Sequence, residues 1–146
     1  MPHLLLTLLV VASGLACHYE PGEMERVAAV RHISLHGYQG GVALKSASYL
    51  GRVVWIRRPD GVVEGPFRVV DCFCGPPWCP DGPYPPRGWA VDVDDQTWAG
   101  WIGLRQESGS GPLPGVTVLY DPAWVPGSRF PGWSGVWREY QQGVLP

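Results

Sequence analysis

Positive charge is scarce in this chain, and so is charge of either sign. Only 16% of its 146 residues are charged, and its 11 lysines and arginines are slightly outnumbered by 13 aspartates and glutamates, which leaves a formal net charge of −2. A domain that binds nucleic acid through the phosphates usually carries a basic face or stripe. The composition therefore gives no indication of a nucleic-acid partner.

Long hydrophobic runs are also missing. The most apolar stretch, residues 4–16 (LLLTLLVVASGLA), is shorter than the roughly 20 residues of a membrane-spanning helix. It has the length of a secretory signal peptide, with Gly14 and Ala16 placed for cleavage after Ala16. We therefore expect residues 1–16 to be a signal peptide and the protein to be secreted or periplasmic. Lipidation of Cys17 is a second interpretation, and a buried N-terminal strand or helix is a third.

Cysteine is sparse too, with four residues in the chain. Cys72, Cys74 and Cys79 form a C-x-C-x4-C cluster, and the simplest arrangement in an oxidising compartment is one disulfide among them. A zinc site that takes its fourth ligand from His32, His36 or a distant aspartate is an alternative, as are unpaired thiols. We expect no bound metal, because a fourth zinc ligand would have to come from far along the chain. We also expect no cofactor.

Glycine, proline and tryptophan are abundant, with 20, 16 and 8 residues. Glycine and proline at this level favour turns and loops. The tryptophans and the 45% hydrophobic fraction indicate a packed core. The length suits one domain with a real core, and no segment repeats at a fixed period. We expect a folded, loop-rich, mainly β domain.

The clearest secondary structure is a predicted β-hairpin. Residues 52–57 (RVVWIR) are rich in β-branched and aromatic side chains. Residues 59–61 (PDG) supply the turn, and residues 62–71 (VVEGPFRVVD) return as a second strand. Further strands are predicted at residues 89–93 and 115–122. Short strands, one short helix and long loops together indicate a small closed barrel.

The domain organisation follows from these segments. Residues 17–30 are expected to be an exposed linker, residues 31–122 the barrel, and residues 123–146 a Trp-rich tail packed on it. A short strand is predicted around His32 and His36, which would place both side chains on one face.

Two aspartates, Asp71 and Asp92, each follow an apolar strand, and we expect these strands to be neighbours. Two carboxyl groups can divide the roles of acid and base. Residues 89–91 would partly desolvate Asp92 and raise its pKa, so Asp92 is the candidate acid and Asp71 its partner. Both could instead bond backbone amides at strand ends. Asp94 and Asp95 fit the N-cap and first turn of a short helix.

The order of these segments resembles the double-psi β-barrel family, which includes expansins, barwin-like proteins, rare lipoprotein A, and related endoglucanases and lytic transglycosylases. Residues 50–72 (LGRVVWIRRPDGVVEGPFRVVDC) are similar to the family's hairpin and its strand ending in V-x-D. Residues 89–101 (WAVDVDDQTWAGW) resemble the h-D-L-S-x-x-A-F segment, and residues 111–122 (GPLPGVTVLYDP) the closing strand. In this match Asp71 and Asp92 take the places of the family's two aspartates.

The resemblance implies a small six-stranded double-psi β-barrel with one or two short helices and long Pro/Gly loops. The chain departs from the family pattern at Asp94, where the family carries serine. It also lacks an N-terminal s-x-Y-G motif, unless residues 35–41 (LHGYQGG) stand for it. Hydrolytic members keep a polar or acidic partner in that region, so the resemblance leaves catalysis open.

The implied protein is an exported monomer that acts on a polysaccharide, either peptidoglycan or a plant-type glucan. It would cleave the polymer lytically or hydrolytically through Asp92 with Asp71, or it would bind without turnover as an expansin-like module. Trp78, Trp89 and Tyr38 are the candidate substrate-binding residues, because sugar rings stack on aromatic faces; core packing is the alternative. A further alternative is a secreted structural or inhibitory protein.

Overall fold

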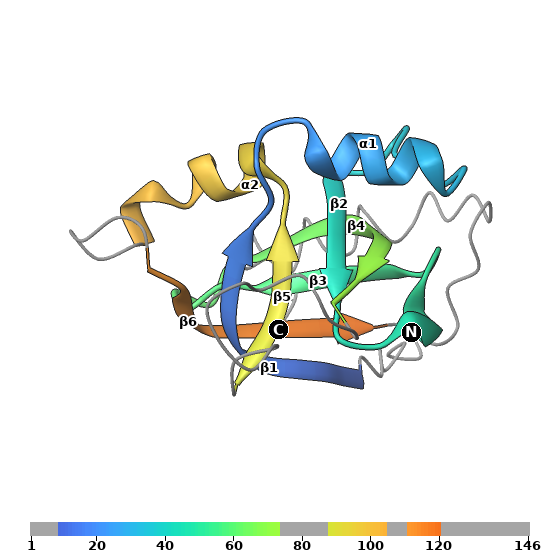
Figure 1. The fold of residues 1–146 in the computed structure, drawn as a ribbon. Helices are drawn as coiled ribbons and strands as arrows, with labels where there is room; N and C mark the ends of the chain where they lie inside the picture. The colour runs from blue at the N-terminus through green and yellow to red at the C-terminus, as the bar shows by residue number, and fades with distance from the viewer. Residues whose placement is uncertain (1–8, 74–87, 105–110, 121–146) are drawn as a thin grey trace, which may run out of the picture.

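The protein is described by a computed structural model that covers residues 9–73, 88–104 and 111–120. These residues form six strands, two α-helices and two short 3₁₀ helices (Figure 1). The strands are β1 (Leu9–His18), β2 (Gly40–Leu44), β3 (Val53–Arg57), β4 (Val63–Cys72), β5 (Trp89–Val93) and β6 (Leu113–Tyr120). The helices are α1 (Glu23–Val30), α2 (Asp95–Gly100), η1 (Ala47–Tyr49) and η2 (Ile102–Leu104).

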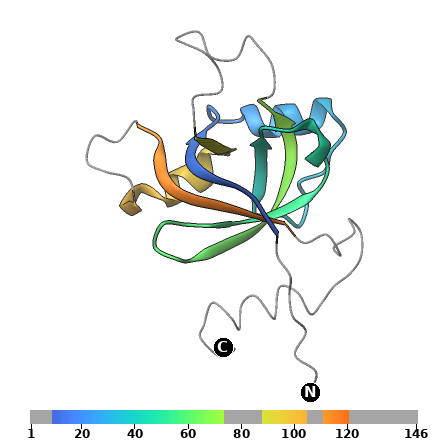
Figure 2. The ribbon, with the colours of Figure 1, turned by 90° about the horizontal axis from the view of Figure 1, so that it is seen from below.

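The six strands close into one barrel in the order β1-β5-β2-β4-β3-β6, with β6 returning to β1. β1 pairs with β5 and β2 pairs with β4 in parallel, and the remaining pairs are antiparallel. Figure 2 shows the strands curving around a common interior. The prediction of a mainly β, six-stranded barrel with short helices is confirmed, and so is the β3–β4 hairpin.

The barrel interior is filled by alternate side chains from every strand, together with two tryptophans that follow β5. Because successive side chains of a strand point to opposite faces, the residues between them face outward. The interior residues are Ala16, Val42, Leu44, Val54, Ile56, Phe67, Val69, Val91, Val93, Trp98, Trp101, Leu113, Val116 and Val118.

β1 is the main difference from the expected organisation. It pairs with β6 over most of its length and with β5 at its C-terminal end, and Ala16 is fully buried. The barrel therefore includes residues 9–18, and the expected linker at residues 17–30 consists of the end of β1, a short connection and helix α1. Removal of residues 1–16 stays a prediction, but the barrel described here needs residues 9–16.

β1 passes very close to the start of β5. Gly14 has a φ of 145°, a conformation that residues with a side chain rarely adopt, and a Cβ there would overlap the carbonyl oxygen of Gly88. The same carbonyl accepts a hydrogen bond of 2.7 Å from the N–H of Leu15. The glycine that suggested a signal-peptide cleavage site thus has a packing role inside the barrel.

Helix α1 lies across β2 and β4 at one end of the barrel (Figure 1). Met24 and Ala28 are buried on this side and pack against Val70 of β4. The helix ends at Arg31, and His32 follows with a φ of 56°, which turns the chain away from the helix. The strand expected around His32 and His36 is therefore absent there; the segment is a turn, and β2 begins only at Gly40.

Helix α2 begins where the sequence predicts. Asp94 is its N-cap, and one carboxylate oxygen accepts a 2.7 Å hydrogen bond from the backbone N–H of Thr97. Asp95 lies in the first turn, where a negative charge is favourable. Among the described residues, no helix is long and apolar enough to cross a membrane.

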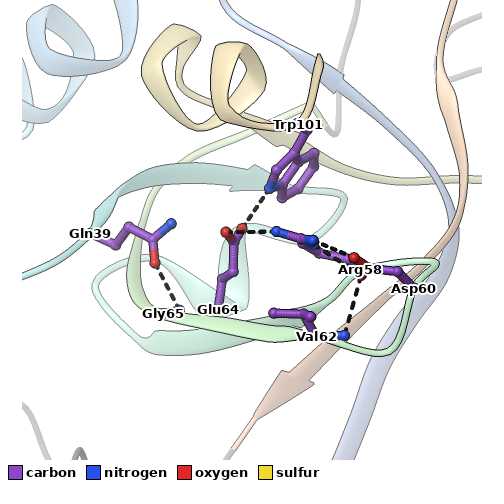
Figure 3. Close-up of polar contacts among 7 residues, drawn as sticks. All are labelled: Gln39, Arg58, Asp60, Val62, Glu64, Gly65 and Trp101. Atoms are coloured by element: carbon purple, nitrogen blue, oxygen red, sulfur yellow. Dashed lines mark hydrogen bonds and ion pairs between the residues drawn. The ribbon is translucent and has the colours of Figure 1, made fainter. Parts of the chain in front are cut away.

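A polar cluster ties the β3–β4 hairpin to the chain after α2 (Figure 3). Glu64 on β4 accepts a 2.5 Å hydrogen bond from the indole N–H of Trp101, which is almost fully buried. The other carboxylate oxygen of Glu64 accepts from Arg58 at 3.4 Å, and Arg58 also pairs with Asp60 at the hairpin turn. The cluster gives a buried indole its acceptor and anchors the hairpin.

Truncation of β1 is expected to unfold the barrel, because loss of residues 1–16 leaves β5 and β6 each with an unpaired edge. Thermal unfolding followed by tryptophan fluorescence measures this beside a control that lacks only residues 1–8 and keeps all of β1. A cooperative transition at the same temperature in both truncated proteins would show that β1 is dispensable.

Glu64→Ala is expected to lower the free energy of unfolding by about 1–3 kcal/mol, because it leaves the buried Trp101 N–H without its acceptor. Asp60→Ala, which removes a more exposed partner of the same arginine, should cost less. Urea unfolding of the two variants makes the comparison. Equal losses would argue against a structural role for the Glu64–Trp101 contact.

Candidate functional site

Four strands place one residue each in a single row across the barrel. Cys17 of β1 pairs with Asp92 of β5, Asp92 pairs with Ala43 of β2, and Ala43 pairs with Asp71 of β4. β2 thus separates the two aspartates, and the expectation that their strands are neighbours is wrong. With strands about 4.8 Å apart, the two backbones are about 10 Å from each other. Both aspartates nevertheless lie opposite the same alanine.

Asp92 points away from the barrel interior, because its neighbours Val91 and Val93 point into it. Its residue is only 6% exposed. One carboxyl oxygen, Oδ1, accepts a 2.8 Å hydrogen bond from the indole N–H of Trp89, three residues earlier on the same strand. Within the described residues this is the one hydrogen bond of the Asp92 side chain, so Oδ2 has no hydrogen-bond partner there.

The electrostatic environment of Asp92 favours its protonated form. Burial raises its pKa from 3.8 to about 6, and the negative charge of Asp71 adds to the rise. The hydrogen bond from Trp89 and a positive charge on His18 act in the opposite direction, but burial outweighs them. The desolvation of this carboxyl group, expected from the apolar strand, is present in the structure.

Asp71 has a different environment. Its Oδ2 accepts a 2.6 Å hydrogen bond from the phenol of Tyr19, and its Oδ1 accepts a 2.8 Å hydrogen bond from the guanidinium of Arg31. The side chain is 16% exposed. A carboxylate accepts at both oxygens, and the two donors fix the orientation of this side chain. The site therefore combines a buried acid with a carboxylate that is held in place.

His18 completes the surroundings of Asp92. Its ring stacks on Trp98 of α2, with ring centroids 4.9 Å apart and planes 22° from parallel. Its Nδ1 lies 3.0 Å from the carbonyl oxygen of Tyr19, so the N–H on Nδ1 donates to that oxygen. His18 is the last residue of β1 and Tyr19 follows it directly, so the site is built only when that strand is in place.

Three comparisons, with protein-family models, with curated proteins and with solved structures, found no match. The geometry of the site therefore carries the functional argument. A second carboxylate cluster, around Glu64, is a weaker candidate. Both of its oxygens are already engaged, by Arg58 and by Trp101, in contacts that anchor the hairpin.

The predicted substrate-binding residues have three different outcomes. Trp89 lies at the site, but its indole N–H donates a hydrogen bond to the carboxyl group of Asp92. Tyr38 packs against the apolar cluster around Val53, under the guanidinium of Arg68, which lies 5.5 Å from the ring centre. Trp78 lies outside the described residues.

The predicted disulfide stays a prediction, because Cys74 and Cys79 lie outside the described residues. The described ranges contain no group of three or more histidine, cysteine, aspartate or glutamate side chains placed to hold a metal ion.

The sequence reasoning missed Tyr19, Arg31 and His18, which fell in or beside the expected linker. One signal was available, because His18 and Tyr19 are polar residues that directly follow an apolar run. This is the same pattern that singled out Asp71 and Asp92. Arg31 carries no such signal, since only the packing of α1 brings it to β4.

Ionisation of Asp92 is expected to cost stability. A folded-state pKa of about 6 against 3.8 means that the stabilising effect is complete below about pH 4 and is lost as the pH rises through 6. The loss amounts to about 3 kcal/mol. The free energy of urea unfolding of the wild type, minus that of Asp92→Asn, should therefore fall by about this amount between pH 3 and pH 7. Asp95→Asn is the control, and a constant difference for Asp92→Asn would contradict the account.

Proposed function

We propose that this domain is a double-psi β-barrel that cleaves a polysaccharide, with Asp92 as general acid and Asp71 as its carboxylate partner. The observation that carries the proposal is the contrast between the two side chains. Asp92 is buried, with a pKa of about 6 and, among the described residues, no hydrogen-bond partner on Oδ2, whereas both oxygens of Asp71 are held by Tyr19 and Arg31.

The topology supports the double-psi assignment. Two parallel pairs, β1 with β5 and β2 with β4, lie within an otherwise antiparallel barrel. The order along the chain is a hairpin, an aspartate at the end of β4, an aspartate within β5 and then a short helix, which agrees with the order of the motifs that carry the resemblance. Tyr19, directly after the N-terminal strand β1, also gives Asp71 a polar partner.

The chemistry requires a proton for the oxygen of the glycosidic bond. A carboxylic acid that stays protonated near pH 6 can deliver it from Oδ2. A nearby carboxylate then either activates water or stabilises the positive charge that develops on the sugar. In a lytic reaction no water is needed, and Asp92 would act as both acid and base. Asp71, held at both oxygens, suits a role as a fixed negative charge.

We further propose that the protein is monomeric and acts outside the cytoplasm, secreted or in the periplasm, where structural polysaccharides are found. A working barrel at that location retains Leu9–His18, because this strand closes the barrel and carries His18. Lipidation of Cys17 after cleavage would remove most of this strand and is not part of the proposal.

Asp92→Asn is expected to abolish the release of soluble fragments from purified peptidoglycan or cellulose, with a loss of at least about 100-fold. The amide oxygen of the substituted side chain would still accept from Trp89, so the fold should persist, and circular dichroism checks this. Anhydro or reducing ends on the products separate lytic from hydrolytic chemistry. Asp95→Asn, in the first turn of α2, is the matched control and should keep its activity.

Each other outcome has a defined meaning. If wild type and Asp92→Asn both pellet with the polymer and neither releases products, the proposed catalytic activity is contradicted. The protein would then be an expansin-like binding module. Neither binding nor products on either polymer would favour a structural or inhibitory protein.

A further inference from the structure

We propose that Arg31 is a specificity residue, which binds a carboxylate group on the polysaccharide beside Asp71. The inference rests on the proposed function and names the substrate class of the same site, an acidic polysaccharide with carboxylated sugars. A uronic acid and a lactyl-bearing amino sugar both present such a group, and the experiment below separates these two sources.

The geometry leaves most of the Arg31 guanidinium available. One nitrogen, Nη2, donates to Oδ1 of Asp71 at 2.8 Å. Among the described residues, this is the one hydrogen bond that the Arg31 guanidinium makes. A guanidinium has five N–H donors arranged in a fixed fork, which matches a carboxylate. The side chain of Arg31 is 39% exposed whereas that of Asp71 is 16% exposed, so Arg31 is the more accessible member of the ion pair.

The backbone of Arg31 is held firmly. Its N–H donates to the carbonyl oxygen of Val27 at 3.0 Å, as the last bond of helix α1. The helix is seated on β4 by Met24, which is fully buried and packs against Val70. Since Asp71 follows Val70 directly, the guanidinium and the carboxylate are positioned by the same packing contact. A cation that is already held in place loses little conformational entropy when it binds a ligand.

The charges of the site explain why a cation is useful there. Asp71 is a fixed carboxylate, and it would repel an acidic sugar if no positive charge stood next to it. Arg26 and Arg58, the other described arginines with ion pairs, pair with carboxylates of their own segments. Lys45, exposed directly after β2, adds a second positive charge near the ends of β2 and β4. A neutral glucan has no group that needs either cation.

Orientation of Asp71 alone does not account for Arg31. The phenol of Tyr19 already holds Oδ2 of Asp71 at 2.6 Å. A purely structural Arg31 would affect every substrate equally, through Asp71. A specificity residue would affect acidic substrates more than neutral ones, and this difference is measurable.

The test is binding of matched polymers to the Asp92→Asn protein, which does not consume them. One pair is polygalacturonate and its carboxyl-reduced product; the other is peptidoglycan glycan strands stripped of peptide and their carboxyl-reduced form. We expect the acidic member of at least one pair to bind about tenfold more tightly. Arg31→Gln should reduce this ratio to about one, and Arg31→Lys should restore part of it. Arg26→Gln, on the same helix, should leave it unchanged.

The pair that shows the preference identifies the source of the carboxylate. Equal weakening of acidic and reduced polymers by Arg31→Gln would overturn the inference and leave Arg31 as a positioning residue for Asp71. Cleavage of neutral and acidic polymers without preference would likewise overturn it while the proposed function stands. A preference that depends on Arg31, with no products from the wild type on any polymer, would contradict the proposed cleavage but keep the binding site.

Discussion

Closure of the barrel by β1 is the constraint on which the rest of the structure depends. This strand lies between β6 and β5, and its tight passage at Gly14 fixes how β5 approaches it. β5 in turn carries Asp92 between β1 and β2, where the carboxyl group is almost fully buried. The end of β1 places His18 against Trp98, and Tyr19, the next residue, reaches Asp71. Without this strand there is no burial of Asp92 and no phenol to hold Asp71.

The two aspartates acquire different properties from a nearly symmetric placement opposite Ala43. Asp92 has an indole N–H as its neighbour and, among the described residues, no cation in hydrogen-bonding contact, so burial dominates and its pKa rises. Asp71 accepts a hydrogen bond from a phenol on one oxygen and from a guanidinium on the other, and these contacts fix its orientation. A pair of carboxyl groups divided in this way is what acid catalysis near neutral pH requires. The donor to Asp92 lies on its own strand, whereas the donors to Asp71 are the residues that directly follow β1 and α1.

The sequence predicted the parts of the fold that depend on local signals. The hairpin follows from β-branched runs around Pro59-Asp60-Gly61, and the start of α2 follows from Asp94, because turns and caps are set by neighbouring residues. An apolar run such as residues 4–16 carries no local signal that separates a leader from a buried strand. Two features depend on contacts between distant segments, which no local pattern predicts. Strand pairing places β2 between the aspartate strands, and the packing of α1 brings Arg31 to Asp71.

The most direct test of the account is an NMR titration of the Asp92 side-chain carboxyl carbon, in the wild type and in Asp71→Asn. The account predicts a pKa of about 6 in the wild type and a lower pKa in Asp71→Asn, because the charge of Asp71 contributes to the rise. A wild-type pKa near the ordinary value of 3.8 would contradict the central claim that Asp92 is a buried acid poised to donate a proton.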